Sequence, residues 1–359
     1  MAYTTIDDPS AYFKVQLYTG DGTAIGSGGQ AITFDDTDTN MQPDFTWIKN
    51  RDATDTHSLF DAVRGATNIL SSVVNSAESN NTESLTTWGS DGFTVGNKDT
   101  VNTNTEKFVS WNWKAGTTGS GTTSGGGTGQ AYSFSASTTA GFSITQYEGN
   151  GTDAHTIPHS LGAVPTIVWA KNRDGDNGWF CMQPNGTTDP WTDFAYLDLT
   201  TAFADEDTAW SDEQPTSSVV TLGNAGSCNT NANTYILYCW TPIQGYSKFG
   251  FYTGNGNANG TFVYTGFRPA WIMTKRTDGA NGWIIYDNKR QGYNPNNDEL
   301  FAEVTDAEVT TDDRFDILSN GFKSRSASQD TNGNGSGYSY MAFAEQPFVN
   351  SNGVPCTAR

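Results

Sequence analysis

The sequence predicts an all-β protein made of three tandem β-sandwich units of the jelly-roll type, with few short helices. Two observations lead to this fold class. Charged residues are only 16% of the 359-residue chain, so its polar surface rests on Asn, Thr, Ser, Gly and Asp, which favour turns and strands over helices. In addition, one set of short motifs occurs three times, separated by short alternating runs that are typical of strands.

The first repeated motif is Tyr-x-Gly-Asp/Asn-Gly. It begins at Tyr18, Tyr147 and Tyr252. After each copy a proline stands six residues before a lysine, in the pairs Pro43/Lys49, Pro165/Lys171 and Pro269/Lys275. A duplicated unit keeps the positions that its turns and core require, so three copies in one register predict three related units.

The second repeated motif is the phrase WIKNRD at Trp47 to Asp52, which returns as WAKNRD at Trp169 to Asp174. Its apolar residues predict a strand, and Asn-Arg-Asp begins a polar turn that leads to a second strand. In the later copies Asn-Gly precedes Trp179 and Trp283, a strong hairpin signal. We expect the lysine and arginine to lie at a solvated strand end, with a ligand contact as the alternative.

These repeats divide the chain into units at 1–114, 131–242 and 243–359. Residues 115–130, AGTTGSGTTSGGGTGQ, have little to bury and are interpreted as a linker. We expect this linker to lie against protein surface in an assembly, because ordering it costs backbone entropy. Two short helices are expected, within SLFDAVRGATNILSSVVNSAES (58–79) and NDELFAEVTDAEV (297–309).

The formal charge of -20, from 19 basic and 39 acidic residues, argues against nucleic acid as a partner. No window approaches the length of a membrane span. The first residues also lack the pattern of a signal peptide. We therefore expect a protein made in a cytoplasm, with no nucleic-acid partner and no membrane insertion.

The sequence predicts no enzyme, no cofactor and no metal site. The three histidines form no catalytic pattern, and no nucleophile elbow or phosphate-binding loop is present. The EF-hand candidates beginning at Asp330 and Asp174 lack the bidentate Glu, although a looser calcium site on a turn stays open. The four scattered cysteines are expected to be free thiols, with a Cys228–Cys239 bridge as the alternative.

Several longer stretches resemble a known family. GYSKFGFYTGNGNANGTFVYTGFRPAWIMTKRTDG, DNKRQGYNP, LSNGFKSRS and the ending YMAFAEQPFVNSNGVPCTAR resemble the C-terminal part of virion structural proteins of marine tailed bacteriophages, described as tail-fibre or lectin-like jelly-roll repeat proteins. FSITQYEGNGTDAHTIPHSLGAVPTIVWAKNRDG resembles a repeat found more widely in phage fibres. The resemblance implies a virion protein with a lectin-like sandwich, and it supplies no ligand residue.

Binding of a sugar is the chemistry that the aromatic content favours, because aromatic rings beside Asn/Asp turns suit sugar rings. The candidate residues form two groups, one in each later unit. They are Trp179 with Asp174 and Asn177, and Trp283 with Asp278 and Asn281. The alternative is that both tryptophans belong to the core or to contacts between subunits.

Three hypotheses for the function follow. The first is a tail-fibre or spike component that binds a host-surface glycan, and the second is a capsid decoration or head-fibre protein with a structural role. The third and least favoured is a glycan depolymerase. In the first two the chain resides in the virion with other virion proteins, and we expect a homo-oligomer, a trimer, because cyclic symmetry covers sheet edges.

Overall fold

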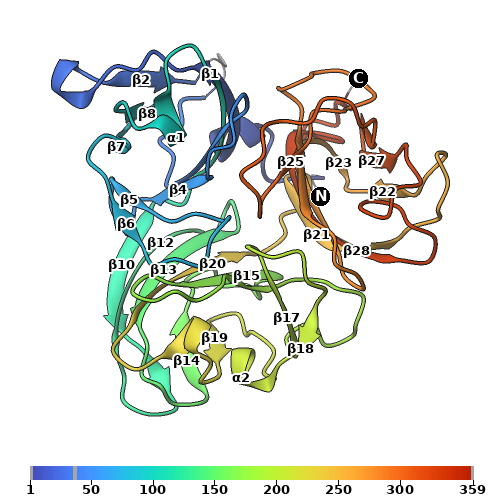
Figure 1. Ribbon diagram of the computed structural model, residues 1–359. Helices are drawn as coiled ribbons and strands as arrows, with labels where there is room; N and C mark the ends of the chain where they lie inside the picture. Colours follow the sequence, from blue (N-terminus) through green and yellow to red (C-terminus); the bar gives the residue numbers. More distant parts are fainter. Residues whose placement is uncertain (1–2, 35–38, 357–359) are drawn as a thin grey trace.

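The computed structural model describes residues 3–34 and 39–356. Figure 1 shows three β units around a common centre, the first in blue, the second in green to yellow and the third in orange to red. The predicted all-β class with three sandwich units and few short helices is confirmed. Both described ends lie on the third unit, where the Tyr3 hydroxyl donates to the Gly266 carbonyl at 2.7 Å.

The first unit has a main antiparallel sheet and a smaller one. The main sheet has the order β1 (Phe13–Thr19), β9 (Lys107–Trp113), β3 (Phe45–Asn50) and β4 (Ser58–Asp61). The smaller sheet has the order β2 (Gln30–Thr33), β8 (Gly92–Val95) and β7 (Leu85–Gly89). Two-residue strands β5 (Asn68–Ile69) and β6 (Ser79–Asn80) pair beside them, and the short helical turns are η1 (Pro9–Ala11), η2 (Ile25–Ser27) and α1 (Asp99–Asn102).

The second unit repeats the central order and extends it at both edges. Its main sheet runs β10 (Thr117–Thr122), β12 (Ala131–Ser137), β13 (Phe142–Glu148), β20 (Thr234–Trp240), β15 (Ile167–Asn172), β16 (Phe180–Met182), β17 (Asp193–Tyr196) and β18 (Ala204–Asp205). The smaller sheet has the order β11 (Ser124–Gly125), β14 (His155–Pro158) and β19 (Val219–Leu222). The helical turns are α2 (Asp207–Trp210) and α3 (Gly226–Asn229).

The third unit has the same plan. Its main sheet has the order β21 (Ser247–Thr253), β28 (Gly337–Pro347), β23 (Phe267–Arg276), β24 (Trp283–Asp287) and β25 (Leu300–Phe301). Its smaller sheet has the order β22 (Phe262–Tyr264), β27 (Gly321–Ser324) and β26 (Phe315–Leu318). In all three units the strand that ends in the repeated tyrosine motif (β1, β13 or β21) pairs with the last strand of the unit, and β3, β15 or β23 lies on the other side of that last strand, as expected for copies of one unit.

Two of the sequence predictions about local structure are wrong. Residues 115–130 do not form the expected linker between two units, because β10 and β11 within them pair with β12 and β14 of the second unit. The expected helices at 58–79 and 297–309 are replaced by the short strands β4, β5 and β25. In both cases pairing with a neighbouring strand prevails over local composition, because it satisfies the backbone N–H and C=O groups.

The Tyr-x-Gly-Asp/Asn-Gly motif fixes the ends of β1, β13 and β21, one strand in each unit. Its tyrosine stacks on an aromatic residue of the last strand, as Tyr147 does on Tyr235 with ring centroids 5.2 Å apart. The first glycine of the motif cannot be replaced by a residue with a side chain, because a Cβ on Gly149 would lie 2.3 Å from the Thr230 carbonyl oxygen. Tyr18 and Tyr252 stack in the same way on Phe108 and Tyr338.

The three main sheets share one hydrophobic core at the centre of the molecule. One face of each main sheet packs on its own smaller sheet, and the other face packs on the other two units. Indole rings from different units pack against one another. The ring centroids of Trp47 and Trp169 are 6.2 Å apart, and those of Trp111 and Trp271 are 6.3 Å apart. The three units therefore form one body with approximate threefold symmetry, rather than separate domains with separate cores.

Candidate functional site

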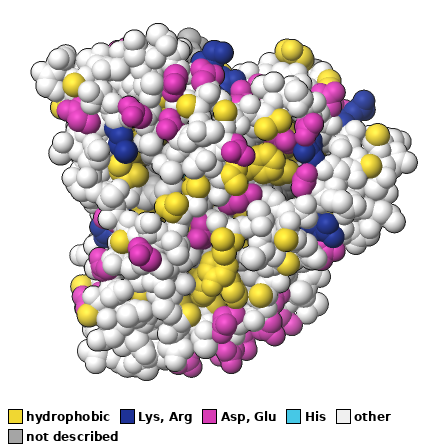
Figure 2. All heavy atoms as spheres, viewed as in Figure 1, with side chains coloured by type: hydrophobic (Ala, Val, Ile, Leu, Met, Phe, Trp, Pro, Cys, Tyr) yellow, Lys and Arg dark blue, Asp and Glu magenta, His cyan; other side chains and the backbone are white. Residues whose placement is uncertain are grey.

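Each contact between two units is called a seam here. The first seam joins the first and second units, the second joins the second and third, and the third joins the third and first. Figure 2 shows hydrophobic side chains gathered in two patches on one face, one over the second unit and one over the third. The residues of the repeated phrases lie at these seams.

The lysine of each repeated phrase is buried and crosses a seam. The ammonium group of Lys171 donates to the carbonyl of the next residue, Asn172, at 3.0 Å and to the carbonyl of Asn177 in its own turn at 2.8 Å. A third bond reaches Asn75 of the first unit at 2.8 Å. Lys49 and Lys275 make the equivalent bonds to Thr305 and Thr200 of their neighbouring units, at 3.1 and 3.0 Å. The three lysines thus connect the three units in a closed ring. The prediction that they lie at a solvated strand end is wrong.

Burial lowers the pKa of Lys49, Lys171 and Lys275 to about 8. The unfolded chain keeps these protons until about pH 10.4. Above pH 8 the unfolded state therefore binds more protons than the folded state, and the free energy of unfolding should rise with pH. This gain in unfolding free energy ends near pH 9, because the cysteines of the unfolded chain ionise there. In the folded chain Cys228 and Cys239 stay protonated, since burial raises their pKa.

We therefore expect the free energy of unfolding to increase between pH 8 and 9, by at most about 1.4 kcal/mol for each lysine. Replacing Lys171 by methionine should make this increase smaller, because one of the three groups is lost. Urea denaturation at pH 7.5, 8.0, 8.5 and 9.0 measures it. Lys107→Met at an exposed position is the matched control. An unchanged slope in Lys171→Met would contradict the assignment.

The two candidate tryptophans are seam residues as well. Both are fully buried. The indole N–H of Trp179 donates to the Ser71 carbonyl of the first unit at 2.8 Å, and that of Trp283 donates to the Tyr196 carbonyl of the second unit at 2.9 Å. Neither ring can stack on a sugar in this structure, which contradicts the expected exposed aromatic face and agrees with the alternative of packing between units.

The polar candidates lie in the turns beside these tryptophans. Asp174 accepts from the Thr234 hydroxyl at 2.8 Å, and Asp278 pairs with Arg276 at 2.7 Å. Asn281 donates to Asp330 at 2.7 Å. These three side chains therefore have partners within their own units. The remaining candidate, Asn177, accepts from Asn172 at 2.9 Å and also lines a cavity at the first seam.

An Asp-x-x-Arg pair clamps two of the three seams. In the third unit Asp287 pairs with Arg290 at 2.6 Å and accepts from the Trp111 indole of the first unit at 3.0 Å. Arg290 also contacts Glu308, which binds Arg51 of the first unit at 2.6 Å.

The same arrangement holds the first seam. Asp61 pairs with Arg64 and accepts from the Tyr238 hydroxyl of the second unit at 2.7 Å. Arg64 contacts Glu78, which binds Arg173 of the second unit at 2.6 Å. These ion pairs therefore join the first and second units.

The cavity at the first seam has a volume of about 620 Å³. Residues 73–76 of the first unit form one wall, and residues 176–178, 196, 198–199 and 227 of the second unit form the others. This volume lies in the range of small-molecule sites. Of the predicted binding residues only Asn177 lines it. The sequence analysis did not identify Tyr196, Asp198 and Ser227, which also line the cavity. They can be recognised only when the second unit is compared with the third, position by position.

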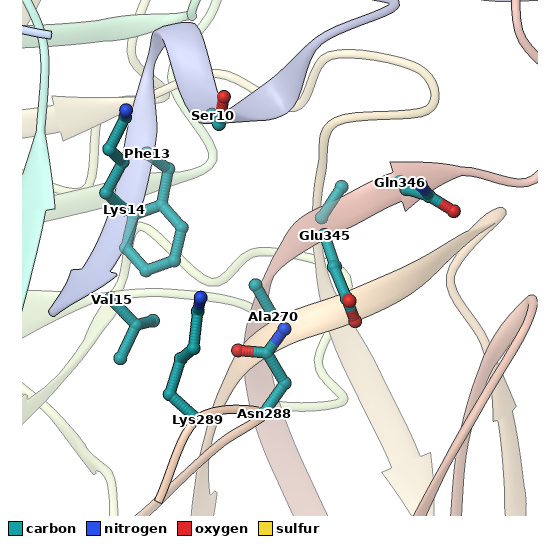
Figure 3. A pocket seen from close by; sticks show the side chains of 10 residues that line it. Ser10, Phe13, Lys14, Val15, Ala270, Asn288, Lys289, Glu345 and Gln346 are labelled. Atoms are coloured by element: carbon teal, nitrogen blue, oxygen red, sulfur yellow. The ribbon is translucent and has the colours of Figure 1, made fainter. Parts of the chain in front are cut away.

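Figure 3 shows a second cavity, at the third seam, with Phe13 and Lys14 from β1 on one side and Glu345 and Gln346 from β28 on the other. Its volume of about 200 Å³ lies below the usual range for organic ligands. We therefore take the larger cavity at the first seam as the candidate functional site.

Within residues 3–34 and 39–356 no group of three or more His, Cys, Asp or Glu side chains is placed to hold a metal ion. Asp330, from one EF-hand candidate, is paired with Arg314 at 2.9 Å. All four cysteines are free, so the alternative Cys228–Cys239 bridge is not formed.

The fold and the seams define this chain as an all-β protein of three interlocked sandwich units. A family described as a domain of unknown function, DUF7483, matches residues 8–347, and the chain belongs to this family. The match runs through all three units, as expected if they form one body. No curated protein and no solved structure matches the chain. No helix in the described part of the chain is long and apolar enough to cross a bilayer.

Proposed function

We propose that this chain is a structural protein of a bacteriophage virion, made in the host cytoplasm, and that it serves in a tail fibre or spike that binds a host-surface glycan. The stretches that resemble marine phage virion proteins support the virion as its location. The observation that carries the proposal is the closed ring of three units around one aromatic core. Such a body keeps one fixed shape. Attachment to a host requires a fixed binding surface and no catalysis.

A capsid decoration or head-fibre protein is the second candidate. One observation favours it: Trp179 and Trp283, the rings expected to meet a glycan, join the units instead. A role in stabilising the particle would need nothing more than such seams and contacts with other virion proteins. Glycan depolymerase activity is the least favoured, and we propose no enzyme.

A homotrimer remains a prediction. Two features that favoured it in the sequence are, however, explained by contacts within a single chain. Residues 115–130 pack on the second unit itself. The three units already place their main sheets around a closed centre. Light scattering at micromolar concentration would test it, with a trimer giving three times the chain mass.

The location test uses phage particles that encode this chain. Mass spectrometry of purified particles and gold-labelled antibody against the chain should place it on the tail. Purified chain added to host cells should reduce phage adsorption. Labelling of the capsid with no effect on adsorption would favour the decoration role. Absence of the chain from the particle would contradict both roles.

A further inference from the structure

We propose that the cavity at the first seam binds a neutral sugar residue of a glycan, and that Tyr196 and Ser227 determine whether a seam can do so. The inference deepens the proposed attachment function and rests on it for the source of the glycan. It is carried by the cavity itself and by a comparison between two seams of the same chain.

Polar groups that keep free hydrogen-bonding capacity line this cavity. Ser227 is only 8% exposed, yet its hydroxyl makes no hydrogen bond with the described residues. Asp198, also 8% exposed, accepts from the Trp179 amide at 2.8 Å and from its own backbone N–H. Tyr196 is half-buried, and its hydroxyl makes no hydrogen bond with the described residues. These groups open onto the cavity and keep capacity for further hydrogen bonds, so they are available to a polar occupant.

The second seam has different side chains at the positions equivalent to Tyr196 and Ser227. Strand register places Phe301 of the third unit where the second unit has Tyr196. Asp330 precedes Tyr338 by the same number of residues as Ser227 precedes Tyr235, the equivalent tyrosine of the last strand. Asp330 accepts from Asn281 at 2.7 Å, whereas the shorter Ser227 makes no such bond to Asn177. Two exchanges, Asp to Ser and Phe to Tyr, therefore leave the first seam without this hydrogen bond and with an additional hydroxyl group.

The lining suits a neutral sugar. Carboxylates of Asp176 and Asp198 accept from sugar hydroxyls, and the Tyr196 and Ser227 hydroxyls can donate or accept. Val74 and Leu199, 39% and 44% exposed, offer an apolar wall for the C–H face of the ring.

An anionic sugar fits poorly in the same place. The two carboxylates and the chain charge of -20 repel it. The nearby Lys171 ammonium is bound to the carbonyls of Asn75 and Asn177, so it is committed to the seam.

The test uses the full chain with glucose, galactose, mannose, N-acetylglucosamine and glucuronic acid in saturation-transfer NMR and titration. At least one neutral sugar should bind, with a dissociation constant in the millimolar range, and glucuronic acid should bind at least tenfold more weakly. Ser227→Asp, which installs the residue of the third unit, should weaken binding at least tenfold. Tyr196→Phe should weaken it about fivefold, as expected for one hydrogen bond.

Phe301→Tyr, the reverse exchange at the second seam, is the matched control and should leave binding unchanged. If Ser227→Asp fails to fold, Tyr196→Phe decides. The inference is overturned if no neutral sugar gives saturation transfer, if glucuronic acid binds equally well, or if both cavity variants bind like the unaltered chain. Gold labelling on the tail without sugar binding would contradict the sugar site but not the virion role. Sugar binding by a chain that is absent from particles would contradict the virion role but not the sugar site.

Discussion

The Trp271→Ala variant should lose about 3 to 5 kcal/mol of unfolding free energy, as large-to-small changes in a packed core do. Trp271 is fully buried in the shared core. Its ring centroid lies 5.7 Å from that of Trp113 in the first unit and 5.9 Å from that of Phe343 in its own unit. Its indole N–H has no partner among the described residues. The loss therefore measures packing between units and no hydrogen bond.

Urea denaturation followed by circular dichroism measures this effect. Trp191→Ala is the control, because that ring is only partly buried and packs on the second unit's own core. We expect the control to lose markedly less. Equal losses in the two variants, or a loss below about 1 kcal/mol in Trp271→Ala, would show that the central core contributes little to the stability of the whole chain.

The Asp287→Leu variant should lose a similar amount, about 3 to 5 kcal/mol, because it breaks a buried ion pair and leaves a charge without its partner. Both side chains of the Asp287–Arg290 pair are fully buried. Burial would raise the pKa of Asp287, but the Arg290 charge and the hydrogen bonds from Arg290 and Trp111 lower it below its usual value. The carboxylate is thus ionised at neutral pH, and the third seam depends on it.

Two comparisons separate the pair from a general effect of mutation. Asp287→Leu combined with Arg290→Leu should recover part of the loss, since no uncompensated charge remains. The second unit already has Gln183 and Gly186 at the corresponding positions. Asp278→Ala, in the exposed pair with Arg276, should change stability by less than about 0.5 kcal/mol. A double variant less stable than Asp287→Leu would contradict this account.

The sequence alone was enough to predict the number of units and their all-β character. Copies of one unit repeat the residues that their turns require, and Gly149 and Tyr147 illustrate why: one lies against a carbonyl and the other stacks on the last strand. Those requirements are local. A reader of the sequence can therefore find them without knowing how the units are arranged.

The arrangement of the units could not be predicted in the same way. Lys171 and Trp179 stand next to turn residues, which suggests exposure, yet their partners Asn75 and Ser71 lie in another unit. Nothing in the spacing of the repeats shows that a neighbouring unit supplies a carbonyl at that point. The Gly/Ser/Thr run at 115–130 resembled a linker for the same reason, since its pairing partners lie further along the chain.

The candidate site depended on this missing arrangement as well. Asn177 was identified from its turn, but the cavity that it lines exists only because residues 73–76 of the first unit form the opposite wall. Tyr196 and Ser227 carry no motif of their own. They differ from Phe301 and Asp330 of the third unit, and that difference acquires a meaning only when both units are superposed as copies.

The central claim is that three repeats share one core and therefore fold as one body. Differential scanning calorimetry of the full chain tests it most directly, because cooperative domains unfold in separate transitions when their cores are independent. The account predicts a single transition whose van't Hoff enthalpy equals the calorimetric enthalpy. Two or three resolved transitions, each with the enthalpy of about a third of the chain, would contradict it.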